Sequence, residues 1–403
     1  MPRQGAIVAV LAIAGLASSF MFTLVVPIQS KLPELLNASR EDTAWVVTAT
    51  LLAAAVSTPI AGRLGDMYGK RRIVLILLGL LIVGSVIAAL SPGIGGIIVG
   101  RALQGAVTGV VPLGISIMRD VLHEDRVDAA IALMSATLGV GGAVGMPVSA
   151  IITETSDWHV LFWMAAGLGA VVFVLVALVV PASVLRTAGR FDFAGAIGLA
   201  IGLTGVLLAV SRGNEWGWAS PATLSLGLGG LAVLLVWGWF ELRIREPLLD
   251  LRVAARPAVL LTNLASVAMG FSLFASNVSY PQMLELPASA GGFGLTLVQA
   301  SFIVMPAGLV MMVLSPFSGR LARTIGPRVL LIMGASALIL AYGYSLLWAS
   351  EVWHLLIANL LIGVGIGFGY AGMPMLIMRS VPQHETGASN GLNALFRSLG
   401  TSI

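Results

Sequence analysis

The stretch PIAGRLGDMYGKRR, Pro59 to Arg72, lies between two long apolar runs and holds three glycines, one acid and four bases. A similar stretch, PFSGRLARTIGPR, runs from Pro316 to Arg328. Because the same loop recurs at a constant offset, the chain is expected to contain a duplicated architecture. The matching pairs are Pro59 and Pro316, Gly62 and Gly319, Arg63 and Arg320, Leu64 and Leu321, Gly69 and Gly326, and Arg71 and Arg328.

Composition indicates an all-α polytopic membrane protein. Hydrophobic residues make up 58% of the chain, charged residues only 10%, and the mean hydropathy is +0.99, whereas soluble domains carry about 25% charged residues. Cysteine is absent, which excludes disulfides and thiolate metal sites. No phosphate-binding loop occurs and the four histidines have no metal-ligand spacing, so we expect no cofactor, no bound metal and no ATP-driven step. The bases lie in short connections, which argues for orientation in a bilayer and against a nucleic-acid partner.

Twelve runs are long enough to cross a bilayer as helices, which takes roughly 20 apolar residues. A thirteenth begins near Ala388, and we expect it to be truncated at Ile403. The twelve predicted spans are Gly5–Pro27, Ala44–Ala61, Ile73–Leu90, Ile94–Met118, Ala129–Ile152, Val160–Pro181, Phe193–Ser211, Pro221–Phe240, Ala258–Tyr280, Leu297–Phe317, Val329–Ala349 and Val352–Met378.

The basic residues are distributed unevenly among the connections. If the N-terminus is cytoplasmic, the cytoplasmic connections hold most of the 22 Lys and Arg residues, Arg3 and Arg186 among them. This asymmetry predicts a cytoplasmic N-terminus. The exceptions are Lys31, Arg40 and Arg212 in outer connections, and Arg101 and Arg397 within spans.

The repeat relates span 2 to span 10, which is an offset of eight helices. Span 4 matches span 12 in the same way. Two six-helix repeats are therefore predicted, separated by two inserted helices. We expect an N-terminal bundle over residues 1–182, linker helices over 183–256 and an incomplete C-terminal bundle over 257–403.

Five motifs occur in order along these spans. They are the glycine-rich loop Gly62–Arg72, the pattern of Arg101, Gln104 and Gly105 in span 4, the series Gly139, Gly142, Gly145 and Pro147 in span 5, and the segments NEWGW (214–218) and ELRIREPLLDL (241–251) that flank span 8. Together they resemble the major facilitator superfamily, and in particular its fourteen-helix drug:proton antiporter branch. The resemblance covers the entire chain.

The resemblance implies a conformational latch at the first loop. Asp66 is expected to dock against the start of span 13, near Gly387 to Asn390, and a charge relay is expected to run through Lys70 to Asp120. Gly62 and Gly69 would permit close backbone approach, and Arg71 belongs to the same motif. The acid position of the second loop holds Arg323, so only the first loop is expected to form an acid-dependent latch. Lys70, Arg71 and Arg72 are equally typical of a positively charged membrane anchor.

Arg101 is the clearest intramembrane charge. At mid-helix it costs about 2.5–3.5 kcal/mol on insertion scales, so it should face a cavity or a partner; snorkelling to an interface is the alternative. Gln104 and Thr108 follow on the same helix face, which we expect to line a central cavity.

Two further sets of residues carry both a packing and a functional interpretation. Gly139, Gly142, Gly145 and Pro147 suit close helix packing, or a kinked helix at the contact between the repeats. Polar side chains on spans 1 and 9 should face protein or water. The residues expected to face substrate are Phe22, Thr23, Asn263, Ser266, Asn277 and Tyr280.

No complete span carries an Asp or Glu at mid-depth, and Met21 stands where fourteen-helix relatives commonly have an acid. This weakens an organic-cation substrate, and proton coupling is implied by the resemblance alone, with Asp66, Asp120, Glu34 and Glu154 as candidate carriers. We expect a monomeric, proton-coupled exporter of drugs or small lipophilic metabolites in a bacterial inner membrane. The alternatives are transport of a neutral or anionic metabolite in either direction and, more remotely, a non-transporting receptor or enzyme.

Overall fold

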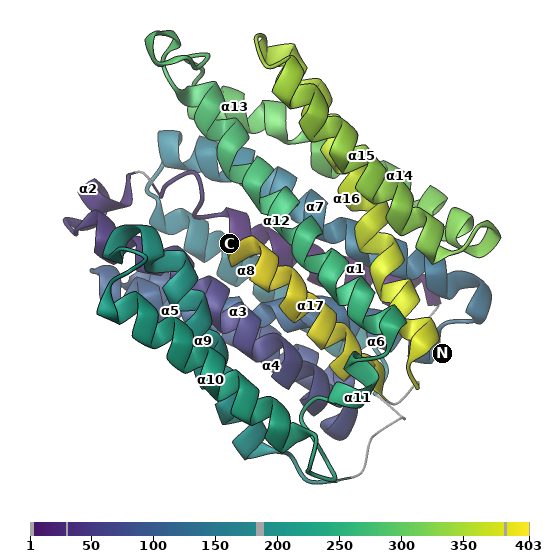
Figure 1. The fold of residues 1–403 in the computed structure, drawn as a ribbon. Coiled ribbons are helices and arrows are strands. Elements are labelled where there is room, and N and C mark those ends of the chain that lie inside the picture. Colours follow the sequence, from purple (N-terminus) through teal and green to yellow (C-terminus); the bar gives the residue numbers. More distant parts are fainter. Residues whose placement is uncertain (1–3, 30, 183–188, 383–384, 403) are drawn as a thin grey trace.

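Long helices run across the molecule in one common direction (Figure 1). The structure is a computed structural model that describes residues 4–29, 31–182, 189–382 and 385–402. Within those residues it contains 12 helices that are long and apolar enough to cross a membrane, which confirms the predicted count. Arg3 and Arg186, two of the predicted cytoplasmic bases, lie outside the described residues.

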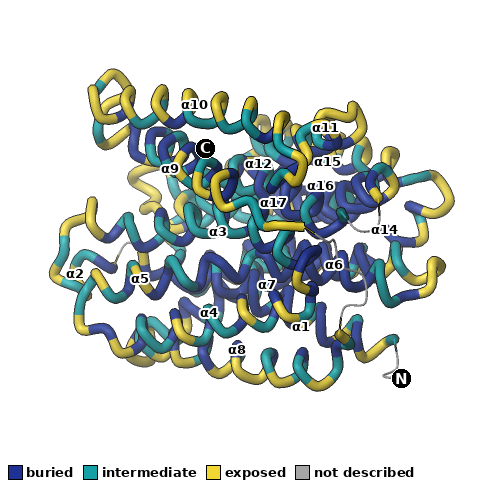
Figure 2. Tube along the Cα trace, turned by 90° about the horizontal axis from the view of Figure 1, so that it is seen from below, coloured by how far each residue is buried: buried dark blue, intermediate teal, exposed yellow. Residues whose placement is uncertain are grey.

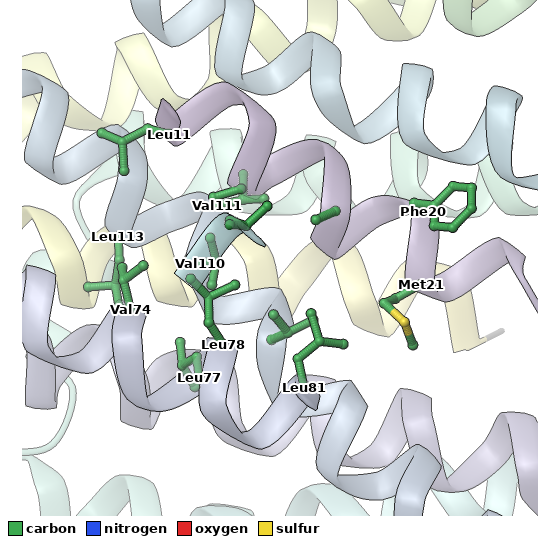
Figure 3. Packing of buried hydrophobic residues seen from close by; sticks show 14 of the residues in the cluster. Leu11, Phe20, Met21, Val74, Leu77, Leu78, Leu81, Val110, Val111 and Leu113 are labelled. Atoms are coloured by element: carbon green, nitrogen blue, oxygen red, sulfur yellow. The ribbon is translucent and has the colours of Figure 1, made fainter. Parts of the chain in front are cut away.

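The first six spans, called the N-terminal spans below, enclose an apolar core. Leu11, Leu78 and Val110 contribute to this core from three different helices (Figure 3). The helices are α1 (Gln4–Thr23), α3 (Arg40–Tyr68), α4 (Lys70–Leu90), α5 (Ile94–Gly105) continued by the 3-10 turn η1 (Ala106–Gly109) and α6 (Val110–Val121), α7 (Glu124–Thr155) and α8 (His159–Val179), with the short α2 (Leu32–Leu36) before α3.

The remaining helices form an outlying pair and a second set of spans, called the C-terminal spans below. The outlying pair is α9 (Phe193–Trp216) and α10 (Pro221–Glu241), followed by the short α11 (Leu251–Ala254). The C-terminal spans are α12 (Pro257–Glu285), α13 (Leu297–Val304) with α14 (Pro306–Thr324), α15 (Pro327–Leu347), α16 (Val352–Ser380) and α17 (Thr386–Ser402), with the turn η2 (Ala288–Ala290) before α13.

The stretch expected to form a loop is helical almost throughout. α3 continues to Tyr68 and α4 starts at Lys70, so the chain turns at Gly69 alone. Gly69 has φ 103°, and Gly326 at the matching position has φ 87°. L-residues other than glycine rarely adopt this conformation. The repeated glycine therefore turns the chain at the matching position in both copies, alone in the first and together with Ile325 in the second.

Two helix pairs make the most extensive contacts between the N-terminal and C-terminal spans. α17 packs along α3, and α14 packs along α7. In Figure 1, α17 lies between α3 and α12. Because α3 corresponds to α14 in the repeat, each repeat contributes its equivalent helix to the contact.

The pair α9 and α10 lies at the periphery. α9 packs against α3 and α17, and α10 packs on α9 with much of its surface exposed (Figure 2). The exposed side chains include Leu228, Leu235 and Trp239, as a lipid-facing helix requires.

The sequence predicted that Arg212 lies in an outer connection, and this prediction is wrong. α9 extends past the predicted end at Ser211 to Trp216, so Arg212 lies inside the helix and is buried. It forms an ion pair with Glu215 at 2.5 Å and lies over the ring of Trp45. Its role is therefore to attach α9 to the start of α3.

Candidate functional site

Asp66 lies buried at the start of α17. Its carboxylate accepts hydrogen bonds from the backbone N–H of Gly387 at 3.2 Å and of Ala388 at 2.8 Å. The first N–H groups of a helix have no partner within the helix, and the helix dipole favours a negative charge there. The contact expected between Asp66 and the beginning of span 13 is present. We call the end of the bundle that carries Asp66, Lys70 and Asp120 the latch end.

Lys70 compensates the buried carboxylate. Its ammonium lies 3.8 Å from Asp66 and 2.6 Å from Asp120, and it donates a hydrogen bond to the Thr386 hydroxyl at 3.3 Å. The predicted link from Asp66 through Lys70 to Asp120 therefore exists as a contact, and it also holds α17. A buried charge without partners would be strongly unfavourable, which explains why the three groups occur together.

Gly62 brings α3 and α17 into backbone contact. A Cβ at Gly62 would collide with the carbonyl oxygen of Gly387. Arg71, also part of the motif, donates a hydrogen bond from its guanidinium to the carbonyl oxygen of Ala177 on α8. That bond lies within the N-terminal spans.

The second copy of the motif makes its own contact at the latch end. A Cβ at Gly319 would collide with the backbone of Ala129 on α7. Arg323 donates to the carbonyl oxygen of Asp125 at 2.9 Å, and Arg379 pairs with Asp128 at 3.0 Å. The first copy therefore offers an acid to α17, and the second copy offers the base Arg323 to α7, beside which Arg379 at the end of α16 adds a second base. The sequence analysis did not predict this second contact, although Asp125 and Asp128 near the start of span 5 could have indicated acidic partners for the bases.

A cavity of about 180 Å³ lies between the N-terminal and C-terminal spans. Its wall is mainly apolar and includes Leu138, Met146 and Phe274. Of the residues expected to face substrate, Phe22, Thr23 and Asn277 line it. The structure thus brings together residues of α1 and α12 that lie far apart in the sequence.

The other residues expected to face substrate turn away from this cavity. The Asn393 amide of α17 donates hydrogen bonds to Asn263 at 3.0 Å and to Ser266 at 2.6 Å. Tyr280 hydrogen-bonds Ser345 at 2.7 Å. These groups face neighbouring helices because a buried polar group needs a partner, and in this structure another span supplies it.

Arg101 lines the cavity as expected and is 1% exposed. It donates to the carbonyl oxygen of Met21 and to the side-chain oxygen of Gln104, both at 3.0 Å. Thr108 also lines the cavity. Gln104 does not, because its amide turns toward α4 and donates to Ser85 at 2.7 Å. Of the three side chains expected on one cavity-lining face, Arg101 and Thr108 therefore line the cavity and Gln104 does not.

The glycines of α7 serve three different contacts. Gly139 packs on Met311 of α14, Gly142 lines the cavity, and Gly145 packs on Thr23 of α1. Pro147 lies within the helix, which continues through it. The glycine series therefore places α7 against the C-terminal spans, the cavity and α1 at once.

Two cavity residues were not identified as site residues from the sequence. Arg397 of α17 and Tyr370 of α16 both line the wall, with the guanidinium 5.0 Å from the ring centroid. Sequence reasoning had placed Arg397 in an incomplete span, and a lone tyrosine among apolar residues gave no signal.

Comparisons with known proteins agree with this architecture. Residues 11–403 match the family model of the Major Facilitator Superfamily. The lincomycin resistance protein LmrB of Listeria monocytogenes is 28% identical over 343 residues, which cover 83% of this chain and 70% of the relative. The multidrug resistance protein Stp of Mycobacterium tuberculosis is 26% identical over 399 residues, which cover 96% of this chain and 72% of the relative. For another matching relative, the chain spans only 62% of the relative's length.

The fold resembles solved transporters as well. The proton:xylose symporter XylE from E. coli superimposes with a TM-score of 0.71 at 12% identity, over 99% of this chain and 86% of that chain. The resemblance predicted from the motifs is thereby confirmed at the level of the family. Because the family model matches nearly the whole chain, this protein belongs to the Major Facilitator Superfamily of membrane transporters.

Proposed function

We propose that this protein exports drugs or small lipophilic metabolites across the inner membrane of a bacterium by alternating access, coupled to protons. The bundles of residues 1–182 and 257–403 would rock about the central cavity, with the linker helices of residues 183–256 remaining peripheral. A monomer contains both bundles and needs no second copy for this motion.

The contacts of Asp66 with Gly387 and Ala388 carry the proposal. They close one end of the interface between the two sets of spans, where both copies of the repeated motif cross from one set to the other. The bases of the motif gather there, which supports a cytoplasmic latch end and a cytoplasmic N-terminus. In this state the cavity is separated from the cytoplasm.

Proton coupling would involve the buried group of Asp66, Lys70 and Asp120. Protonation of a carboxylate in this group would weaken its hold on α17 and Lys70, since the charge that favours both contacts is lost. Proton uptake and opening of the latch end would then be linked.

A second candidate is transport of a neutral or anionic metabolite. The observation that favours it is the cavity wall, which contains no Asp or Glu among the described residues. A cationic drug would find no carboxylate there.

The experiment uses everted vesicles that contain the full chain and an acidified interior. Addition of a substrate should collapse the pH gradient, with lincomycin and naphthalene-2-carboxylate as the first probes. Collapse that is absent from vesicles with Asp66→Asn supports proton-coupled export. Flux that does not respond to the pH gradient would refute proton coupling, and the absence of any flux with either probe would argue against export of such compounds.

A further inference from the structure

Two arginines line the central cavity, one from each set of spans. Arg101 belongs to α5 of the N-terminal spans, and Arg397 belongs to α17 of the C-terminal spans. We propose that they form a binding site for the anionic head group of an amphipathic organic anion, such as an aromatic carboxylate. The proposal rests on the transport function and names the class of its substrate.

Among the residues that the structure describes, no acid forms an ion pair with Arg101. Its hydrogen bonds go to two neutral oxygens, of Met21 and Gln104, and its buried Nε has no partner. A buried charge without an opposite charge is strongly unfavourable. The neutral oxygens orient the guanidinium, and a bound anion would supply the missing charge.

The Arg397 guanidinium contacts an aromatic ring and, among the described residues, hydrogen-bonds no oxygen atom. It lies over Tyr370, and within the described part of the chain its guanidinium makes no hydrogen bond or ion pair. The cation–π contact orients the guanidinium and leaves its N–H groups free for a ligand. Arginine presents a planar fork that matches a carboxylate in a bidentate arrangement.

The acids of the protein lie elsewhere. Among the residues that the structure describes, the buried carboxylates are Asp66 and Glu241. Asp66 is at the latch end, and Glu241 lies beside Gly195 at the junction of α9 and α10. Neither lines the cavity. The described wall therefore carries positive charge from both arginines and no negative charge.

The rest of the wall suits an apolar ligand body. Phe22, Phe274 and Met146 line it, and Thr108 and Asn277 add a few hydrogen-bonding groups. A ligand with an apolar ring and one anionic group would bury its ring against these side chains and place its charge between the arginines. Such a ligand would touch both sets of spans at once.

The test uses two probes with the same ring and opposite charge, naphthalene-2-carboxylate and 2-naphthylmethylammonium. Binding to the full-length protein in phosphatidylcholine nanodiscs is measured by equilibrium dialysis, with empty nanodiscs as the blank. Phosphatidylcholine has no net charge, so the nanodisc adds no net anionic lipid that would compete for the site. We expect the carboxylate to bind at least about tenfold more tightly than the ammonium, as for hydrogen bonds to charged groups.

Variants identify the site. Arg397→Gln and Arg101→Gln should each weaken carboxylate binding by about tenfold or more. The matched control is Arg72→Gln, since Arg72 is exposed and outside the cavity, and it should change nothing. If Arg101→Gln does not fold, Arg397→Gln alone tests the anion site. The Arg397 side chain is only partly buried, so its replacement should leave the fold intact.

Tighter binding of the ammonium, or unchanged carboxylate binding by Arg397→Gln, would overturn the anion site. Flux measurements distinguish a failure of the anion site from a failure of the proposed transport function. Export of the ammonium probe by the wild type would leave transport standing and refute the anion assignment. Specific carboxylate binding without any flux would support the anion site and refute transport of this probe.

Discussion

Asp66 and Ala388 lie 322 residues apart in the sequence, yet the backbone N–H of Ala388 donates to the Asp66 carboxylate at 2.8 Å. This bond joins the end of α3 to the first turn of α17. It depends on a negative charge at a helix N-terminus.

Replacing Asp66 by Asn should impair transport without loss of membrane insertion. The neutral amide cannot exploit the helix dipole and leaves Lys70 with one carboxylate fewer. We expect flux in proteoliposomes to fall by about tenfold, the scale of a helix-terminus charge effect. Immunoblots of membranes control for insertion. Transport at the wild-type rate would disprove the role of the carboxylate.

Gly62→Ala should hold the latch end open. The added methyl group would meet the carbonyl oxygen of Gly387, whereas at Gly79, the control, a Cβ meets nothing within 4 Å. Accessibility is measured with Ser116→Cys, a buried position that hydrogen-bonds Thr386. Aqueous thiol reagents should label this cysteine faster with Gly62→Ala than with Gly79→Ala. Equal labelling would mean that the close approach is dispensable.

Reversing one charge of the Arg379 and Asp128 pair should lower transport, and reversing both should restore it. The pair is partly exposed, so its coupling free energy should be only about 0–1 kcal/mol. We therefore expect roughly a few-fold loss for Arg379→Asp or Asp128→Arg alone. A double-mutant cycle on flux measures the coupling. If the double variant is no better than the single ones, the pair does not act as a unit.

Arg101→Cys should react with aqueous thiol reagents, because this position lines the cavity. The chain has no native cysteine, so labelling reports one site. Gln104→Cys is the matched control, since Gln104 is buried against Ser85 outside the cavity wall. Protection of Arg101→Cys in every condition, or equal labelling of both cysteines, would argue for a packing role instead.

Much of the fold could be predicted because its signals are local. Runs of apolar residues marked the twelve spans, and the paired glycines Gly69 and Gly326 marked the repeat. The contact of Asp66 with span 13 could be anticipated only through the family resemblance. The sequence could not predict which polar side chains face the cavity, because that depends on which residue of another helix lies beside each of them. Asn263 and Asn277 both belong to the polar series of span 9, but Asn393 of α17 binds the first and leaves the second on the cavity wall.

The sequence by itself determined that this chain spans a membrane, that twelve runs within it are long enough to cross, and that one plan of helices recurs along it, because hydropathy and turn residues act over a few neighbouring positions. Only the tertiary structure decided which charges meet. Arg323 and Asp125 contact one another, and Arg101 and Arg397 face one cavity, because helix rotation and crossing place side chains from distant segments. Those angles are set by the packing of whole helices, such as the contact of Gly62 with Gly387, and no local pattern encodes them.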